Sequence, residues 1–243
     1  EQGHSTGGFL LDFGFDHDGG VKTNQTVFAV HILALKAAVF LMYALALLEL
    51  IVFPIPSEAS TVEVLRARTE GGRVKGWPAA VFGHLAMFCF FLIPLVWIFF
   101  PGVTEYLVMT THALAPVRNW AAAVLILWGS VFTLYAVLDL HRFRAEHVDA
   151  NILKRDGAYR ISRNPQVLGN HIAGAGILCA FPALVMFLLF GGYFIHMHRK
   201  IALEEDHLHR KLGRPYAQYR LRAGRYLRLR VPSKRTFTGP PAT

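Results

Sequence analysis

The sequence is poor in charged residues, in cysteine and in acidic side chains. Only 17% of its 243 residues are Asp, Glu, Lys or Arg, whereas about a quarter is usual for a soluble domain. Cys89 and Cys179 both lie in apolar stretches and form no Cys-x-x-Cys pattern, which argues against a disulfide framework and a thiolate metal or redox site. The 25 basic residues outnumber the 16 acidic ones and give a net charge of +9. A membrane or another anionic partner is therefore expected.

Long apolar stretches are what the chain has in place of charge. They cover residues 27–53, 78–100, 120–140 and 168–197. About 20 apolar residues suffice for a helix to cross a bilayer. The last stretch is long for one crossing and short for two, and Pro182 lies near its middle, so we expect a helical hairpin that turns there; a single kinked span is the alternative. The sequence thus predicts an all-α, multi-spanning bundle of about five membrane segments with a cytosolic cofactor pocket.

The distribution of basic residues predicts how this bundle lies in the membrane. Lys and Arg gather in the 54–77 loop, in the connector after the third span and in the C-terminal part. Three spans and a hairpin place these segments on one side, which the positive-inside rule makes cytoplasmic, with the N-terminus outside. Nucleic acid is the other interpretation of a basic chain, but this placement favours membrane lipids.

The chain divides into four parts on this interpretation. They are an exposed tail over 1–26, the N-terminal spans over 27–140, a C-terminal half with the hairpin over 141–230, and a basic tail over 231–243. Two polar clusters flank the hairpin in the C-terminal half. The first is Gly157-x-Tyr159-Arg160, Arg163-x-Pro165 and Leu168-Gly169; the second is Glu204-Glu205, Leu208, Leu212-Gly213, Tyr216 and Tyr219.

In this order, the two clusters resemble the signature of the isoprenylcysteine carboxyl methyltransferase and phospholipid N-methyltransferase families. The resemblance covers residues 140–230 and implies S-adenosylmethionine as cofactor and a hydrophobic acceptor that enters from the bilayer. It places the cofactor at Tyr159, Asn164, Pro165, Leu168, Gly169, Gly174, Gly176, Glu204 and Glu205. The two glutamates could accept hydrogen bonds from the cofactor's ammonium and ribose.

The acceptor is left open by the sequence. A carboxylate acceptor needs only a cation to orient it, and Arg163 and Arg222 are the candidates, because a guanidinium grips a carboxylate with two hydrogen bonds. An amine acceptor must also lose a proton. His171 or Glu205 could take that proton, and the residues do not choose between them.

Several alternatives remain open at this point. Gly174 and Gly176 could simply let helices pack closely, and the glutamates could pair with nearby basic residues on one helix face. The family usually has His where Asn164 stands and an aromatic residue where Val167 stands, which keeps a non-catalytic accessory subunit of a membrane complex in view. An NADPH-dependent enzyme of the sterol-reductase type is a second alternative. No metal site is expected, because the histidines form no repeated ligand box.

Overall fold

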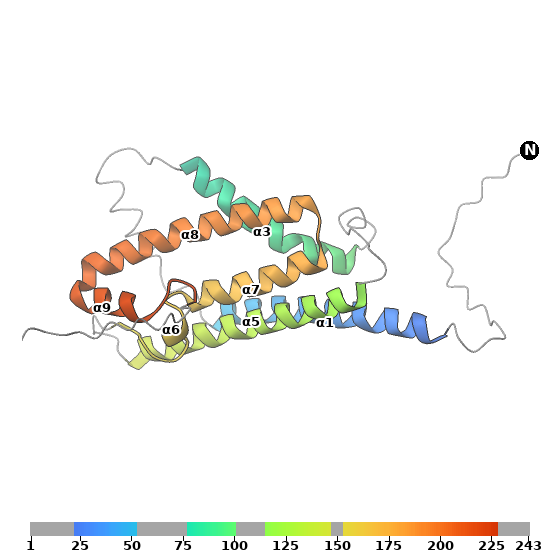
Figure 1. Cartoon of the computed structure of the whole chain (residues 1–243), viewed down its shortest axis with the longest axis horizontal. Helices are drawn as coiled ribbons and strands as arrows, with labels where there is room; N and C mark the ends of the chain where they lie inside the picture. Colours follow the sequence, from blue (N-terminus) through green and yellow to red (C-terminus); the bar gives the residue numbers. More distant parts are fainter. Residues whose placement is uncertain (1–21, 53–76, 101–114, 147–152, 228–243) are drawn as a thin grey trace, which may run out of the picture.

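The computed structural model describes residues 22–52, 77–100, 115–146 and 153–227, and this part of the chain is helical without a β-strand (Figure 1). The helices are α1 (Lys22–Val52), α3 (Trp77–Phe99), α5 (Ala115–Glu146), α6 (Ala158–Ile161), α7 (Pro165–Ala180), α8 (Leu184–Leu212) and α9 (Arg214–Arg222). The all-α prediction is therefore confirmed for the described residues.

Three helices provide the membrane-spanning scaffold. Helices α1, α3 and α5 are long and apolar enough to cross a bilayer, and each coincides with an expected span. The helices extend beyond those spans, however. Helix α1 begins at Lys22 inside the expected tail, and α5 takes in both Ala115 and Glu146. Basic residues placed in the connector, such as Arg142 and Arg144, are thus the last turns of α5.

The expected helical hairpin is present and turns at Pro182. Helix α7 ends at Ala180 and α8 begins at Leu184, because proline lacks the N–H that would continue the helix. Helix α8 then runs back beside α7 toward α6 and α9 (Figure 1). It also continues through the polar stretch after Met197 as far as Leu212, so the second motif cluster lies on the same helix as the returning arm.

Fewer than the expected five membrane segments are found when the described helices are judged by their length and composition. Among the described helices only α1, α3 and α5 satisfy both criteria. Helix α7 has 16 residues, fewer than the roughly 20 that span the hydrocarbon. The 54–76 and 101–114 parts of the expected loops, most of the N-terminal tail and the basic tail over 231–243 lie outside the described residues.

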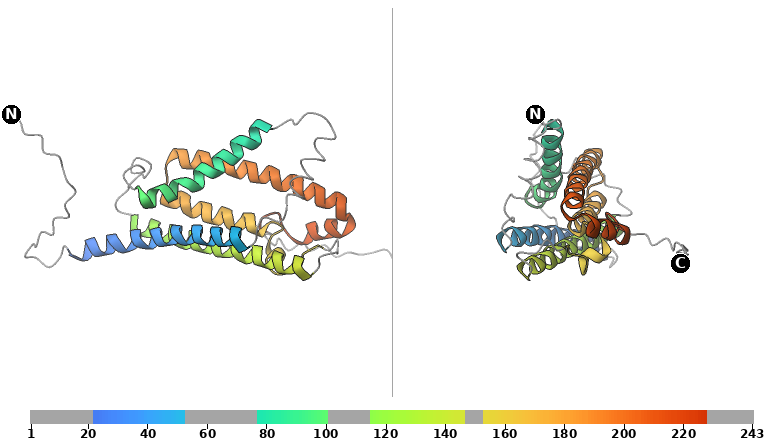
Figure 2. Two further views of the ribbon diagram at one scale, coloured as in Figure 1. Left: turned by 180° about the vertical axis from the view of Figure 1, so that it is seen from behind. Right: turned by 90° about the vertical axis from the view of Figure 1, so that its left-hand side faces the viewer.

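The helices form two groups that meet at the α7–α8 hairpin. Helix α5 lies between α1 and α7, and α3 packs across α8 (Figure 2). The buried side chains between them include Leu35, Val39, Phe90, Ile126, Ile177 and Met186. The C-terminal ends of α1, α5 and α8 lie at the same end of the bundle as α6 and α9 (Figures 1 and 2).

Glycines set the closest approach in the bundle, between α5 and α7. A Cβ on Gly169 would lie 2.7 Å from the carbonyl oxygen of Gly129, and one on Gly176 would lie 2.8 Å from that of Ala122. Both neighbours are backbone atoms, which cannot move aside without separating the helices. Small residues at helix contacts are the usual way in which membrane helices gain packing energy. This contact holds α7 in position against α5, and the candidate site lies at the N-terminus of α7.

We therefore expect Gly176→Ala to destabilise the bundle. The added methyl group must push α5 and α7 apart, at a cost of about 1–3 kcal/mol in the free energy of unfolding. Thermal unfolding in detergent measures this effect. Gly191→Ala in α8 is the matched control, because a Cβ there meets nothing within 4 Å and alanine favours a helix over glycine. An equal loss of stability in both variants would contradict the packing role.

Candidate functional site

A buried carboxylate on α8, Glu205, is the centre of the candidate site. Its side chain is only 6% exposed and lies between two guanidinium groups. Arg225 Nη2 lies 2.9 Å from Oε2, and Arg225 Nε lies 3.3 Å from both carboxylate oxygens. Arg163 Nη1 approaches Oε1 at 3.3 Å. The hydrogen bonds between Arg225 and Glu205 raise the pKa of the Arg225 guanidinium, so this group stays charged at physiological pH.

Asn164, the residue directly before α7, also contacts this ion-pair network. Its Nδ2 donates to the carbonyl oxygen of Arg225 at 3.1 Å and reaches Glu205 Oε1 at 3.5 Å. Asparagine before a helix normally caps the helix with its side chain, but this one makes no such bond. The helix start relies instead on Pro165, whose missing N–H costs nothing in the first turn. The amide of Asn164 is thus used to hold the site together.

A short backbone contact completes the network. Ser162 and Gly224 form an isolated parallel bridge, and Arg163 N donates to the carbonyl oxygen of Gly224 at 2.9 Å. Ser162 Oγ donates to the carbonyl oxygen of Arg225 at 3.1 Å. The segment after α9 is therefore bound to the segment before α7, which brings Arg225 next to Glu205.

The turn that leads into α6 is anchored on the end of α5. Asp139 accepts from the backbone N–H of Ala158 at 3.1 Å and pairs with Lys154 at 3.0 Å. Gly157, the residue before Ala158, has φ +56°. A Cβ at this position would also overlap the Asp139 carboxylate, so only glycine suits it. This anchor places Tyr159, whose carbonyl oxygen accepts from Tyr219 Oη at 2.7 Å.

Glu204 lies in different surroundings from its neighbour Glu205. Its side chain is 46% exposed, and its ion-pair partner, Lys200, is 3.9 Å away. Partial burial raises the pKa of the Glu204 carboxyl group. Its charge also acts on Tyr159, whose pKa is raised mainly by burial, so these two predicted site residues share one region. Of the two glutamates, Glu204 is the one that remains open to a ligand.

The predicted site residues on α7 face neighbouring helices. Leu168 is buried, and Gly169 and Gly176 face α5. Gly174 faces α8, where a Cβ would lie 2.5 Å from Phe190 Cε2. Helix packing, which the sequence left open as an alternative for Gly174 and Gly176, is thus what these residues do in the structure.

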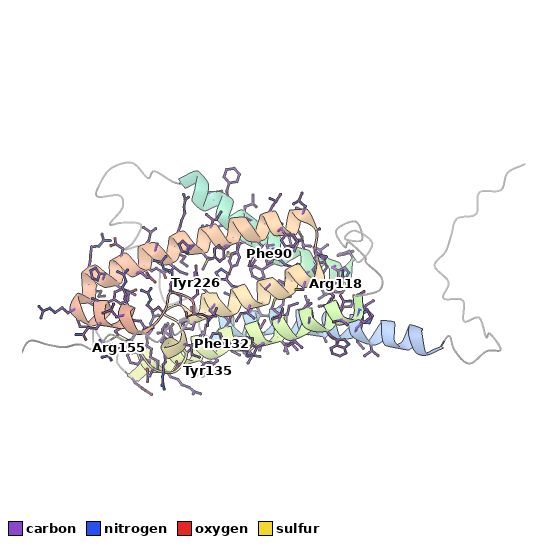
Figure 3. The ribbon with its side chains drawn as sticks, in the orientation of Figure 1. Phe90, Arg118, Phe132, Tyr135, Arg155 and Tyr226 are labelled. Atoms are coloured by element: carbon purple, nitrogen blue, oxygen red, sulfur yellow. The ribbon has the colours of Figure 1, made fainter. Side chains whose placement is uncertain are left out.

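The two candidate arginines have separate environments. Arg163 is largely buried against Glu205. Arg222 is exposed and lines a cavity of about 510 Å³ with Arg155 and Arg160. Figure 3 labels Arg155 beside α6 and α9, at the end of the bundle. The structure does not place Arg163 and Arg222 together, where both could bind one acceptor carboxylate.

A second cavity, of about 260 Å³, lies between α7 and the spanning helices α1, α3 and α5. Its lining is mostly apolar, with Tyr43, Ser130, Thr133 and Asn170 as polar members. Thr133 Oγ1 and Asn170 Oδ1 lie 3.1 Å apart. An apolar cavity with a few polar groups suits a hydrophobic ligand.

Sequence reasoning did not place Arg225, His198 or Tyr226 in the site. Arg225 Nη1 lies 3.1 Å from His198 Nε2, and His198 Nδ1 lies 3.1 Å from Tyr226 Oη. The rings of Tyr226 and His171 are 5.3 Å apart, which places His171 beside the network; Figure 3 labels Tyr226 there. Arg225 continues the basic run after the second motif, and this was the only signal for it in the sequence.

Part of the site falls within a stretch that matches a known family. Residues 117–214 match the family model of the phospholipid methyltransferases. The expected resemblance to membrane methyltransferases is thereby confirmed over this stretch, which holds Arg163, Asn164 and both glutamates and ends before Arg222. No curated protein and no solved structure matches the chain.

We expect Glu205→Gln to destabilise the C-terminal half. The amide keeps the shape but leaves Arg163 and Arg225 without their counter-charge, and loss of one partner from a buried ion pair costs about 3 kcal/mol. Asp206→Asn is the control, because Asp206 pairs with Arg210 on the surface and such pairs contribute less than about 1 kcal/mol. Thermal unfolding in detergent compares the two. Equal stability of both variants would remove Glu205 from its structural role.

Proposed function

We propose that the protein transfers a methyl group from S-adenosylmethionine to a lipid-soluble or membrane-borne acceptor, such as a prenylcysteine-like carboxylate or a phospholipid amine. The match of residues 117–214 to the phospholipid methyltransferases carries the proposal. When bound, S-adenosylmethionine would supply an electrophilic methyl group: an acceptor lone pair would bond to the methyl carbon while the methyl–sulfur bond breaks, its electron pair goes to sulfur and S-adenosylhomocysteine leaves. The residues need only align the partners and exclude water.

The residues at the α6–α7 end fit such a cofactor. Glu204 is a half-exposed carboxylate with only a distant lysine partner, so we assign it the cofactor's ammonium or ribose hydroxyls. Tyr159, Asn164 and Pro165 stay in the proposed pocket beside it. Glu205, already matched by two arginines, acts as a positioning residue for the pocket wall. Leu168, Gly169, Gly174 and Gly176 support the pocket through helix packing.

The acceptor would approach from the spanning helices. The apolar cavity between α1, α3, α5 and α7 has room for hydrocarbon. Asn170 in its lining is six residues along α7 from Asn164, which is about 9 Å of helix. Arg222 is exposed and lines the cavity with Arg155 and Arg160, and it is the proposed cation for an anionic acceptor group, whereas Arg163 pairs with Glu205. His171 beside the network is the candidate to take a proton from an amine, because Glu205 is engaged with both arginines.

The topology proposed with this function places α6, α9 and the end of α8 on the cytoplasmic side. The described residues at this end include the basic last turns of α5, α8 and α9. Excess Lys and Arg near span ends favours the cytoplasmic face. A cofactor made in the cytoplasm could then reach Glu204 without crossing the bilayer.

Asn164 is compatible with both the catalytic and the accessory-subunit interpretations. A histidine at this position can donate from its ring, and the asparagine amide here donates to the Arg225 carbonyl, so the bridge between the segments is kept. The network holds these segments together whether or not a cofactor binds, so cofactor binding is what separates the two interpretations. We therefore keep the accessory-subunit and NADPH alternatives only as outcomes of the binding test.

Calorimetric titration of the detergent-solubilised protein with S-adenosylhomocysteine tests the proposal. We expect micromolar binding that Glu204→Gln weakens about tenfold or more, because a charge-assisted hydrogen bond is lost. Asp206→Asn, the neighbouring surface acid, should leave the affinity unchanged. Labelled S-adenosylmethionine should then transfer its methyl group into a membrane-lipid extract. Binding of NADPH instead, or of neither cofactor by folded protein, would overturn the proposal.

The same titration should depend on pH through Glu204. Burial raises the pKa of this carboxyl group above the usual 4.5, so its negative charge disappears as the pH falls through that raised pKa. We expect the affinity to fall at a higher pH than an ordinary carboxylate would give, and the Glu204→Gln variant to lack this step. A pH profile that is identical in both proteins would exclude Glu204 as the ligand contact.

A further inference from the structure

The cavity at the α6–α9 end is lined by cations that the cofactor pocket does not use. Arg155 and Arg160 come from the segment before α7, and Arg222 comes from the end of α9. All three are exposed, so their charges cost little to place there. The cavity holds about 510 Å³, and none of the described residues that line it is acidic. Its chemistry therefore selects an anion.

Three guanidinium groups around one space suit a phosphate better than a carboxylate. Each guanidinium presents a planar fork of N–H donors that matches two oxygens of an anion. A carboxylate offers two oxygens to such forks, whereas a phosphate offers more and is recognised by arginine clusters. Arg155 also donates to the carbonyl oxygen of Pro215 at 3.4 Å, which holds this side chain against the start of α9.

Apolar side chains stand beside these cations. Ile161 and Leu227 belong to the cavity lining and are 47% and 60% exposed. Leu221, next to Arg222, is 78% exposed. A soluble anion would make no use of these groups, whereas a lipid places hydrocarbon next to its phosphate.

The position of the cavity agrees with a lipid. The turn before α6 is fixed to the last turns of the spanning helix α5 by Asp139, through Lys154 and the N–H of Ala158. The cavity thus lies at the level where a membrane-spanning helix ends and head groups begin. Basic pockets at this level bind lipid phosphates.

We propose that Arg155, Arg160 and Arg222 bind the phosphate of an anionic membrane phospholipid, with its hydrocarbon against Ile161 and Leu227. The proposal deepens the proposed function and rests on it only for Arg222, which was assigned to an anionic acceptor group. Lipid binding is measured without any methyl donor. Its failure is therefore distinguishable from failure of methyl transfer.

The experiment uses the full chain in a non-ionic detergent with phosphatidylglycerol or phosphatidylcholine added to the micelles, and native mass spectrometry to count bound lipid. We expect phosphatidylglycerol to bind more tightly than phosphatidylcholine, which carries no net charge. Arg160→Gln and Arg222→Gln should each weaken phosphatidylglycerol binding about tenfold or more, because a charge-assisted contact is lost.

Arg220→Gln is the matched control. Arg220 is an exposed arginine on the same helix as Arg222 and lies outside the cavity lining. The Arg220→Gln variant has the same net charge as the Arg222→Gln variant. It should bind phosphatidylglycerol within about twofold of the unaltered protein, because no direct contact is lost. Equal losses in the Arg220 and Arg222 variants would overturn the site in favour of general charge attraction. Displacement of phosphatidylglycerol by an equal concentration of inorganic phosphate would overturn the lipid as its source. Thermal unfolding of each variant shows that the fold is retained.

Discussion

The ion pairs of Glu205 with Arg163 and Arg225 are the interaction on which the C-terminal half depends. They join three segments that are far apart in sequence: the turn before α7, the polar end of α8 and the chain after α9. A carboxylate this buried is tolerable only when its charge is matched, and both guanidiniums are needed to surround it. The proposed cofactor pocket depends on these segments being held together.

The packing of α5 against α7 supports the same site from the membrane side. Gly129, Gly169 and Gly176 let the two helices approach until backbone nearly touches backbone, and α7 begins directly after the Asn164 bridge. In a bilayer, where lipid chains are as apolar as the side chains, such contact area is a main source of helix association. Residues with the family's spacing on α7 thus serve the function indirectly, by fixing the helix that carries the polar turn.

The neighbouring glutamates of the second motif cluster, Glu204 and Glu205, have different environments. Glu205 pairs with two arginines, whereas Glu204 stays half exposed. The arginines divide in the same way, with Arg163 buried in the network and Arg222 facing a basic cavity at the membrane surface. The proposed enzyme would therefore keep cofactor contact, structural charge pairing and lipid recognition on separate side chains. Substitutions at each can be told apart.

Hydropathy determined the spanning helices, because a long apolar segment in a bilayer must satisfy its own backbone hydrogen bonds and a helix does so within one segment, and Pro182 determined the turn of the hairpin. The motif order determined the family resemblance. The tertiary structure decided what the sequence left open: which face the α7 glycines present, and that Arg225, 20 residues after Glu205, is the partner of that buried carboxylate. Ion-pair partners follow from how the chain returns on itself, and that return is set by the Ser162–Gly224 bridge and the α9 turn, which leave no periodic pattern in the sequence.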